Sequence, residues 1–396
     1  MNVNTIKYAL AEAINKVIPF LLLPFITRYI SPEEYSKLDI YMMYLTFYQM
    51  LCWFNQNTYF AKNYHKEGDD EKYLALFLPV IINIVLLVPV TLLSVVFFEM
   101  ELYFIPFLSV VVICQLVFLL KQISNQYSGN VNGFVKYQLT ISLVNALLSF
   151  CLVYSGYGAD GRALGMILPV VAVSIYILFK DFKLINRKLI TVTKEDLNSR
   201  FKFGFSLLPY NFLNGWLKDN LARIIIINVV GVSGVLGIYS VTFLYSTPFV
   251  VMSNSLMMVY GPKIFKSDND LAKINALKAS YGKIIVSLFF ILALCLYLSF
   301  PYVVGNGYST YENLVLIFVF SFAINAFTLF NNSVLISFNK TSYVSYNIII
   351  SVLSYFFAFL ALQYFEMDTL YALSISYALG NLVGWRVSFY KVKALE

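Results

Sequence analysis

Predominantly apolar stretches of about 20 residues recur along the whole chain and are separated by short polar segments. A helix needs this length to cross the ~30 Å hydrocarbon core of a bilayer, where backbone hydrogen bonds must be satisfied internally. The sequence therefore predicts an all-α polytopic membrane protein with about 12 transmembrane helices. The expected spans are 5–30, 35–60, 74–98, 102–124, 134–154, 162–179, 201–228, 235–260, 284–300, 311–337, 344–364 and 370–389.

Composition excludes a soluble protein and two kinds of binding site. Hydrophobic residues make up 60% and charged residues only 12% of the 396 residues, against about 45–50% and 25% in soluble domains. The basic residues fall in short loops rather than on one face, which excludes nucleic acid as a partner. All four cysteines lie inside apolar stretches without metal-ligand spacing, so no metal site or disulfide is expected.

Lysine and arginine are distributed asymmetrically between the loops. They gather at both chain ends and after the even-numbered spans, whereas the other side holds only Arg28, Lys37 and Arg162. Because positive loops are retained in the cytoplasm, both termini are predicted to be cytoplasmic.

The longest polar stretch, residues 180–202, divides the predicted spans into two groups of six. We expect an N-lobe at 1–182, a cytoplasmic linker at 183–202 and a C-lobe at 203–396. Within the linker, Thr193 and Asp196 have the spacing of a capping box that can begin a short helix. Residues 133–144 also align with 342–353, so that Tyr137 matches Tyr346. Chance similarity between apolar strings is one interpretation. The other is two six-helix lobes related by pseudo-two-fold symmetry, which is a transporter architecture.

Ionisable residues within the membrane are concentrated in the first helix of each lobe. They are Glu12, Lys16, Arg28, Lys218, Asp219 and Arg223. Each costs roughly 2.5–3.5 kcal/mol on insertion scales, so such groups normally face a cavity or a partner. Glu12 with Lys16, and Asp219 with Arg223, are four residues apart and can form ion pairs that only hold helices together. Alternatively, the surplus cations line a cavity between the lobes and bind an anionic substrate.

A pyrophosphate group suits such cations because it offers several acceptor oxygens to arginine and lysine. Asparagine side chains nearby can bond sugar hydroxyls, although membrane amides more commonly bond between helices. The predicted substrate-binding residues are Lys16, Arg28, Lys218, Arg223, Asn211 and Asn214. Prolines 19, 24 and 209 can bend these two spans by removing backbone donors.

Several segments resemble one family of transporters. The segment VIPFLLLPFITRYISPEEYSKLD at 17–39, FGFSLLP at 203–209 followed by Asp219, and GADGRALG at 158–165 are similar to bacterial O-antigen and capsule flippases. These Wzx-type proteins form the polysaccharide transporter family, within the multidrug and oligosaccharidyl-lipid exporter superfamily. In the resemblance, Arg28 matches the arginine that closes the first helix and Asp219 matches the acid of span seven.

The resemblance implies a transporter, not an enzyme, that moves an undecaprenyl-pyrophosphate-linked oligosaccharide across the inner membrane for O-antigen and lipopolysaccharide assembly. A monomer without a cofactor is expected, with proton or sodium coupling through Glu12 and Asp219 and a possible complex with the polysaccharide polymerase and chain-length proteins. Some relatives have additional spans that this chain lacks.

Two other functions remain open. A cation-coupled drug antiporter of the same superfamily requires an acidic, aromatic cavity, which the surplus of lysine and arginine disfavours. A membrane polysaccharide polymerase ordinarily requires a large outward loop with paired acids. The longest expected outward loop, residues 302–310, contains no such pair.

Overall fold

The computed structural model describes residues 18, 20–67, 71–98, 104–189, 193–229, 234–265, 267, 270–338 and 340–395. Within these ranges the regular structure is helical and contains no strand, and seven segments are long and apolar enough to cross a membrane. The predicted all-α polytopic fold is confirmed. The described residues separate into two compact units, the first holding Ile40–Leu217 and the second Pro19–Asp39 with Lys218–Glu396.

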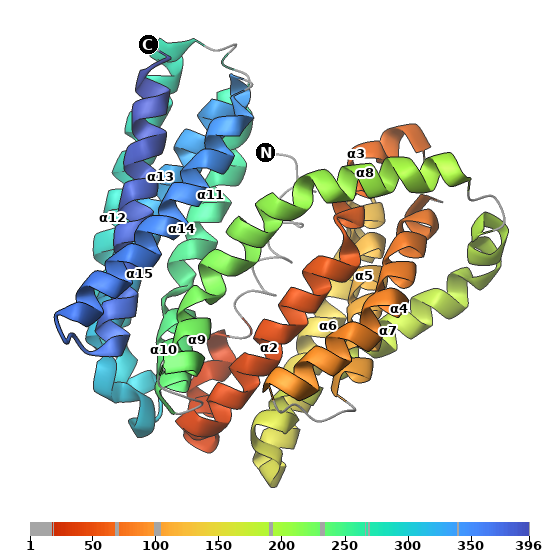
Figure 1. The fold of residues 1–396 in the computed structure, drawn as a ribbon, viewed down its shortest axis with the longest axis horizontal. Coiled ribbons are helices and arrows are strands. Elements are labelled where there is room, and N and C mark those ends of the chain that lie inside the picture. Colours follow the sequence, from red (N-terminus) through yellow and green to blue (C-terminus); the bar gives the residue numbers. More distant parts are fainter. Residues whose placement is uncertain are drawn as a thin grey trace. The chain divides into compact units, whose positions relative to one another are not determined.

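Unit 1 is a helical bundle (Figure 1). It contains the greater part of α2 (Pro32–Trp53), followed by α3 (Gln56–Glu67), α4 (Glu71–Phe98), α5 (Phe104–Tyr127), α6 (Val131–Leu152), the π-helical turn η1 (Val153–Tyr157), α7 (Gly158–Leu189), α8 (Lys194–Tyr210) and the π-helical turn η2 (Asn211–Leu217). Its core joins α2 to α4 and α5. There Tyr48 donates to Asn83 Oδ1 (2.6 Å), and Asn83 Nδ2 donates to the carbonyl of Ser109 (3.2 Å).

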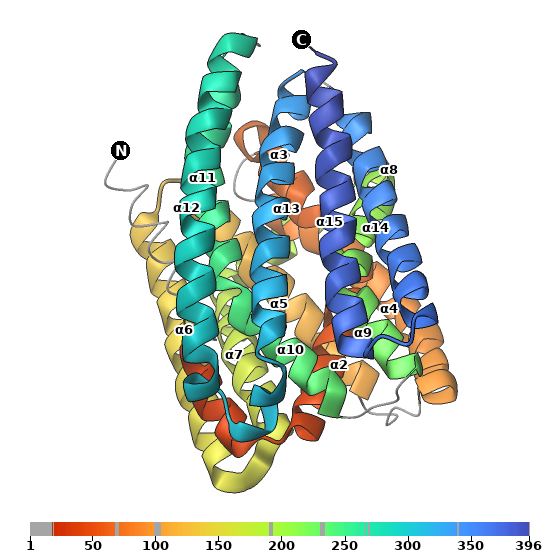
Figure 2. The same ribbon diagram turned by 90° about the vertical axis from the view of Figure 1, so that its left-hand side faces the viewer.

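Unit 2 begins with the helical segment Phe20–Tyr29 and the first residues of α2. It continues with α9 (Lys218–Val229), α10 (Gly234–Ser246), α11 (Pro248–Phe265), α12 (Leu271–Val303), the 3₁₀ turn η3 (Asn306–Tyr311), α13 (Asn313–Ser337), α14 (Thr341–Tyr364) and α15 (Thr369–Lys393). Helices α13, α14 and α15 lie side by side (Figures 1 and 2). Small residues allow this close packing, because Gly380 faces the Ser351 carbonyl.

Three predicted spans depart from a single regular α-helix. Span two divides into α2 and α3 at Phe54 and Asn55, which have φ angles of 46° and 59°. Span seven divides into α8, η2 and α9, and Pro209 lies one residue from the end of α8. Span eight divides before Pro248, the first residue of α11. Proline lacks a backbone donor and a left-handed residue cannot continue a helix, so these positions end regular hydrogen bonding.

The predicted capping box is confirmed at the start of α8. The Thr193 hydroxyl accepts from the Asp196 amide (3.2 Å), and the Asp196 carboxylate accepts from the Thr193 amide (3.3 Å). The preceding polar stretch is helical further than expected, since α7 continues to Leu189. Segment 20–39 belongs to unit 2, and α8 belongs to unit 1. The division into lobes at 183–202 stays a prediction.

Candidate functional site

Segment 20–39 is joined to the rest of unit 2 by three neutral hydrogen bonds. The amide of Gly305 donates to Thr27 Oγ1 (3.0 Å), and the amide of Gly237 donates to Ser36 Oγ (2.8 Å). The third bond runs from the Tyr308 hydroxyl to the carbonyl of Ile30 (2.9 Å). Burial raises the pKa of Tyr308, with a contribution from Tyr35, so its hydroxyl keeps the proton that it donates. These bonds hold segment 20–39, including the first residues of α2, against α10 and η3.

Two glycines make this attachment possible. A Cβ atom on Gly237 would lie 2.0 Å from the carbonyl oxygen of Pro32, and one on Gly305 would lie 2.1 Å from that of Thr27. Any other side chain would have to displace backbone. The attachment therefore places residue 39, one turn beyond Ser36 on α2, beside α9 and α10.

Asp39 forms the charged contact of this attachment. Its Oδ2 accepts from Arg223 Nε on α9 at 2.6 Å and from the Ser240 hydroxyl on α10 at 2.6 Å. Only 12% of the Asp39 side chain and 15% of the Arg223 side chain are exposed. Charge-assisted hydrogen bonds of this length are strong, and their desolvated setting strengthens the attraction further.

Arg223 is fixed at a second point by its own helix. Its Nη1 donates to the carbonyl of Asp219 (2.7 Å), one turn earlier, and to Asn220 Oδ1 (3.3 Å). The guanidinium carbon lies 5.7 Å from the centre of the Phe243 ring, within range of a cation–π contact. These contacts use Nε and Nη1, which leaves Nη2 available within the described part of the chain.

Lys218 and Asp219 complete the cluster as the first residues of α9. Lys218 is half-buried and Asp219 is exposed. The Asp219 carboxylate interacts electrostatically with Lys218, Arg223 and the hydroxyl of Tyr377 on α15. We call Asp39, Lys218, Asp219 and Arg223 the charge cluster. Its two cations and two acids sum to zero, so Asp39 cancels the positive surplus that the sequence predicts here.

The other predicted site residues belong to elements other than those of the charge cluster, or lie outside the described part of the chain. Arg28 is exposed, and its Nη2 donates to the carbonyl of Tyr302 after α12 (3.3 Å). Asn214 lies in η2 of unit 1. Glu12 and Lys16 lie outside the described residues. Predictions about their roles stay predictions.

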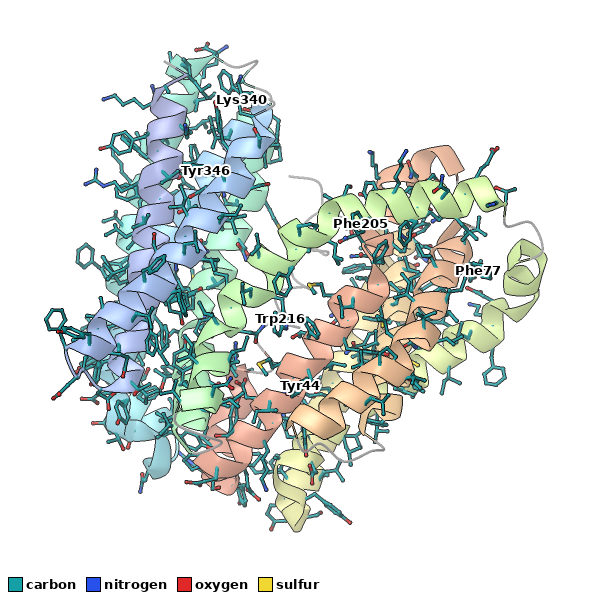
Figure 3. All side chains as sticks on the ribbon, viewed as in Figure 1. Tyr44, Phe77, Phe205, Trp216, Lys340 and Tyr346 are labelled. Carbon is teal, nitrogen blue, oxygen red and sulfur yellow. The ribbon has the colours of Figure 1, made fainter. Side chains whose placement is uncertain are left out.

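Asn211 serves an interhelical bond in unit 1. Its Nδ2 donates to Asn55 Oδ1, and Asn55 Nδ2 donates to the carbonyl of Gly204 on α8 (3.1 Å). Nearby, Trp216 Nε1 donates to the carbonyl of Met43 on α2 (3.3 Å), where Trp216 lies beside the helix (Figure 3). The sequence allowed two roles for this asparagine, a hydrogen bond between helices or a hydrogen bond to a sugar. In the structure the Asn211 side-chain amide forms the interhelical bond.

Sequence reasoning did not select Asp39 or Ser240 as site residues. One signal was present, because Leu38-Asp-Ile-Tyr resembles Leu236-Gly-Ile-Tyr and carries an acid in only one of the two copies. An acid in a predicted span without a cation four residues away requires a partner on another helix. Ser240 gave no such signal. Within the described residues, no group of three or more histidines, cysteines, aspartates or glutamates is placed to hold a metal ion.

The family model for "Polysaccharide biosynthesis protein" matches residues 25–310 of the chain. The chain belongs to this family. The match to polysaccharide biosynthesis proteins covers segment 20–39 from Phe25 onward and all of α9 and α10, so the charge cluster lies within it. No curated protein sequence matches the chain significantly.

Solved structures of transporters share the fold of this chain. An inward-facing multidrug resistance MATE family transporter of the MOP superfamily is 14% identical, with a TM-score of 0.68 over 100% of this chain and 96% of that chain. The lipid II flippase MurJ is 15% identical, with a TM-score of 0.68 over 98% and 87%. A MOP superfamily transporter from Pyrococcus furiosus is 15% identical, with a TM-score of 0.65 over 99% and 96%. At these identities the likeness establishes the fold.

Proposed function

We propose that this protein is a flippase that moves a polyprenyl-pyrophosphate-linked oligosaccharide across the bacterial inner membrane by alternating access. Membership of the family supports a role in polysaccharide assembly. The fold shared with a lipid II flippase is compatible with a lipid-linked substrate. The product of this transport serves O-antigen or another surface polysaccharide.

The observation that carries the proposal is the orientation of Arg223. Its side chain is only 15% exposed, its Nη1 is held by the Asp219 carbonyl of its own helix, its Nε faces the Asp39 carboxylate, and its Nη2 is left for another acceptor. A fixed guanidinium binds phosphate oxygens well because its donors are planar and permanently charged. Lys218, on the same helix, supplies a second cation for a group that carries several negative charges. Arg28, Lys16, Asn211 and Asn214 are the further proposed contacts.

Coupling to protons or sodium is proposed to use Asp219 and Glu12. Asp219 interacts with Lys218 and Arg223, so an anion bound to those cations would change the electrostatic environment of the carboxylate. Such a carboxylate can exchange a cation for the substrate. The proposed orientation places both termini in the cytoplasm and the polyprenyl tail in the bilayer.

The second candidate is a cation-coupled drug antiporter, which the MATE-like fold supports. It is favoured by the neutrality of the charge cluster, since a cationic drug is not repelled there. The Pyrococcus furiosus relative is described as having a binding pocket of reversed polarity that suggests a different function. Substrate charge is therefore the property that separates the two candidates.

Deletion of the gene tests the proposal. The deletion strain should lose surface polysaccharide and accumulate polyprenyl-pyrophosphate-linked repeat units, and the wild-type gene should restore both. Arg223→Ala and Lys218→Ala should each restore less than about a tenth of the polysaccharide, because each removes a charge-assisted contact to phosphate. Arg386→Ala is the matched control, since Arg386 is exposed on α15 and contacts Trp385. Full complementation by both variants would remove the assigned site. Drug sensitivity with normal polysaccharide would favour the antiporter.

A further inference from the structure

Asp39 occupies Arg223 in the manner of an anionic ligand. The carboxylate lies 2.6 Å from Arg223 Nε and also accepts from the Ser240 hydroxyl. A phosphate oxygen would seek the same guanidinium donor, because phosphate and carboxylate oxygens bind guanidinium groups in similar geometry. The cation assigned to the substrate is therefore already neutralised.

Charge balance limits what this cluster can bind. Lys218 and Arg223 are matched by Asp39 and Asp219, and the Arg223 and Asp39 side chains are only 15% and 12% exposed. A pyrophosphate added to this neutral cluster would bring uncompensated negative charge into a poorly solvated region, which is unfavourable. Removal of Asp39 from Arg223 leaves a positive cluster and relieves this cost.

Asp39 lies on α2 at the point where the chain passes from unit 2 to unit 1. It is the last residue of the segment that belongs to unit 2, and α2 continues beyond it into unit 1 as one helix. The neutral hydrogen bonds of Thr27, Ile30 and Ser36 with the remainder of unit 2 do not involve Arg223. An anion bound at Arg223 thus acts on the attachment of α2 at Asp39 and leaves the neutral bonds in place.

We propose that Asp39 is an internal competitor of the anionic substrate: it neutralises Arg223 in the empty protein, and the pyrophosphate group displaces it, which releases α2 from α9. This inference rests on the proposed function and adds the means by which substrate occupancy is signalled to α2. A positioning role for Asp39, in which it orients Arg223 for the substrate, predicts the opposite effect on affinity.

The sign of the change in affinity tests the proposal. Binding of farnesyl pyrophosphate to the purified full-length protein is measured by calorimetry at constant ionic strength. Asp39→Asn keeps an oxygen that can accept from Arg223 and Ser240 but removes the competing charge, so binding should tighten about tenfold or more. Ser240→Ala withdraws one donor from Asp39 and should tighten binding by a smaller factor.

Control variants locate the effect. Ser36→Ala removes a hydrogen bond of the same segment without touching the charge cluster, and its affinity should equal that of the wild type. In the double variant Arg223→Ala with Asp39→Asn, the tighter binding expected of Asp39→Asn should disappear, because the guanidinium for which Asp39 and the pyrophosphate compete has been removed. Thermal unfolding of each purified variant confirms folding, and Ser240→Ala keeps the test decisive if Asp39→Asn fails to fold.

Unchanged or weaker binding by both Asp39→Asn and Ser240→Ala, with clear binding by the wild type, would overturn the competitor role and leave the proposed flippase intact. Absence of binding by the wild type and by both variants would overturn the anion site itself. Tighter binding by Asp39→Asn that survives loss of Arg223 would also contradict the proposal.

Discussion

Gly237 and Gly305 control how closely segment 20–39 approaches the rest of unit 2. A Cβ atom on Gly237 would be 2.0 Å from the Pro32 carbonyl oxygen, a distance that real Cβ atoms do not reach. Gly237→Ala should destabilise the protein by about 1–3 kcal/mol despite the better helix propensity of alanine, because backbone must move. Thermal unfolding in detergent measures this change.

Gly282 on α12 provides the control for this substitution. A Cβ atom there would lie 3.5 Å from the Phe327 ring, an ordinary contact. Gly282→Ala should be neutral or stabilise by about 0.5–1 kcal/mol through helix propensity. Equal unfolding temperatures for the two variants would show that the contact at Gly237 is not restrictive.

Some side-chain interactions could be predicted from the sequence and others could not. The capping box of Thr193 and Asp196 was predictable because its two bonds connect residues three apart. The pairing of Arg223 was not, because its helical neighbour Asp219 offers a carbonyl while its carboxylate partner is Asp39, 184 positions away. Local spacing identifies available partners, and packing selects among them.

Helices α13, α14 and α15 are joined by polar side chains. Asn381 Nδ2 donates to Ser321 Oγ at 2.7 Å, and Asn331 Nδ2 donates to Ser388 Oγ at 3.0 Å. Both bonds connect α13 to α15 among buried residues. Lipid provides little hydrophobic drive for helix association, so such bonds and close packing hold membrane helices together.

A double-mutant cycle with Asn381→Ala and Ser321→Ala should give a coupling energy of about 0.6 kcal/mol, with an upper range near 1.7 kcal/mol. The bond joins two helices, and either single change already removes it. Unfolding free energies of the two single variants and the double variant provide the measurement. Asn381→Ala with Ser255→Ala is the control pair, because Ser255 bonds its own helix at Val251. Additive effects for the first pair would contradict a direct interaction.

Helix ends were predictable where an apolar stretch gives way to polar residues. They were not predictable where a helix is interrupted by a change of backbone conformation within an apolar stretch. The apolar stretches located the helices from α4 to α7 and from α12 to α15 within a few residues, with two exceptions. Helix α7 ends later than expected, at Leu189, and α12 begins thirteen residues earlier than expected, at Leu271. The break at Phe54 and Asn55 gave only a weak sequence signal, since asparagine tolerates the left-handed region but neither residue is glycine or proline. It is stabilised instead by Asn55, whose amide donates to Gly204 on α8.

At the scale of the whole molecule, the distribution of lysine and arginine predicts the sidedness of the chain. Lys340 lies between α13 and α14, on the expected cytoplasmic side, and Asn306 lies between α12 and α13, on the opposite side. Both are exposed. In a variant without the four native cysteines, Asn306→Cys should react with a membrane-impermeant maleimide applied to spheroplasts, because positive loops are retained in the cytoplasm.

Lys340→Cys is the counterpart and should react only after the membrane is permeabilised. Labelled protein on a gel measures both reactions. Immediate labelling of Lys340→Cys with protection of Asn306→Cys would reverse the orientation. Equal labelling of both before permeabilisation would contradict a helix crossing between them.

The sequence by itself determined that this chain is a bundle of membrane-spanning helices, because apolar stretches of sufficient length have few other stable states in a bilayer. It also located the cations of α9, since charge at that depth is costly and conspicuous. Only the tertiary structure decided the partner of Arg223 and the net charge of the cluster. Both depend on Asp39, which is brought to α9 by the close approach of backbone at Gly237 and Gly305. Contacts between residues far apart in sequence are set by packing, which no local pattern encodes.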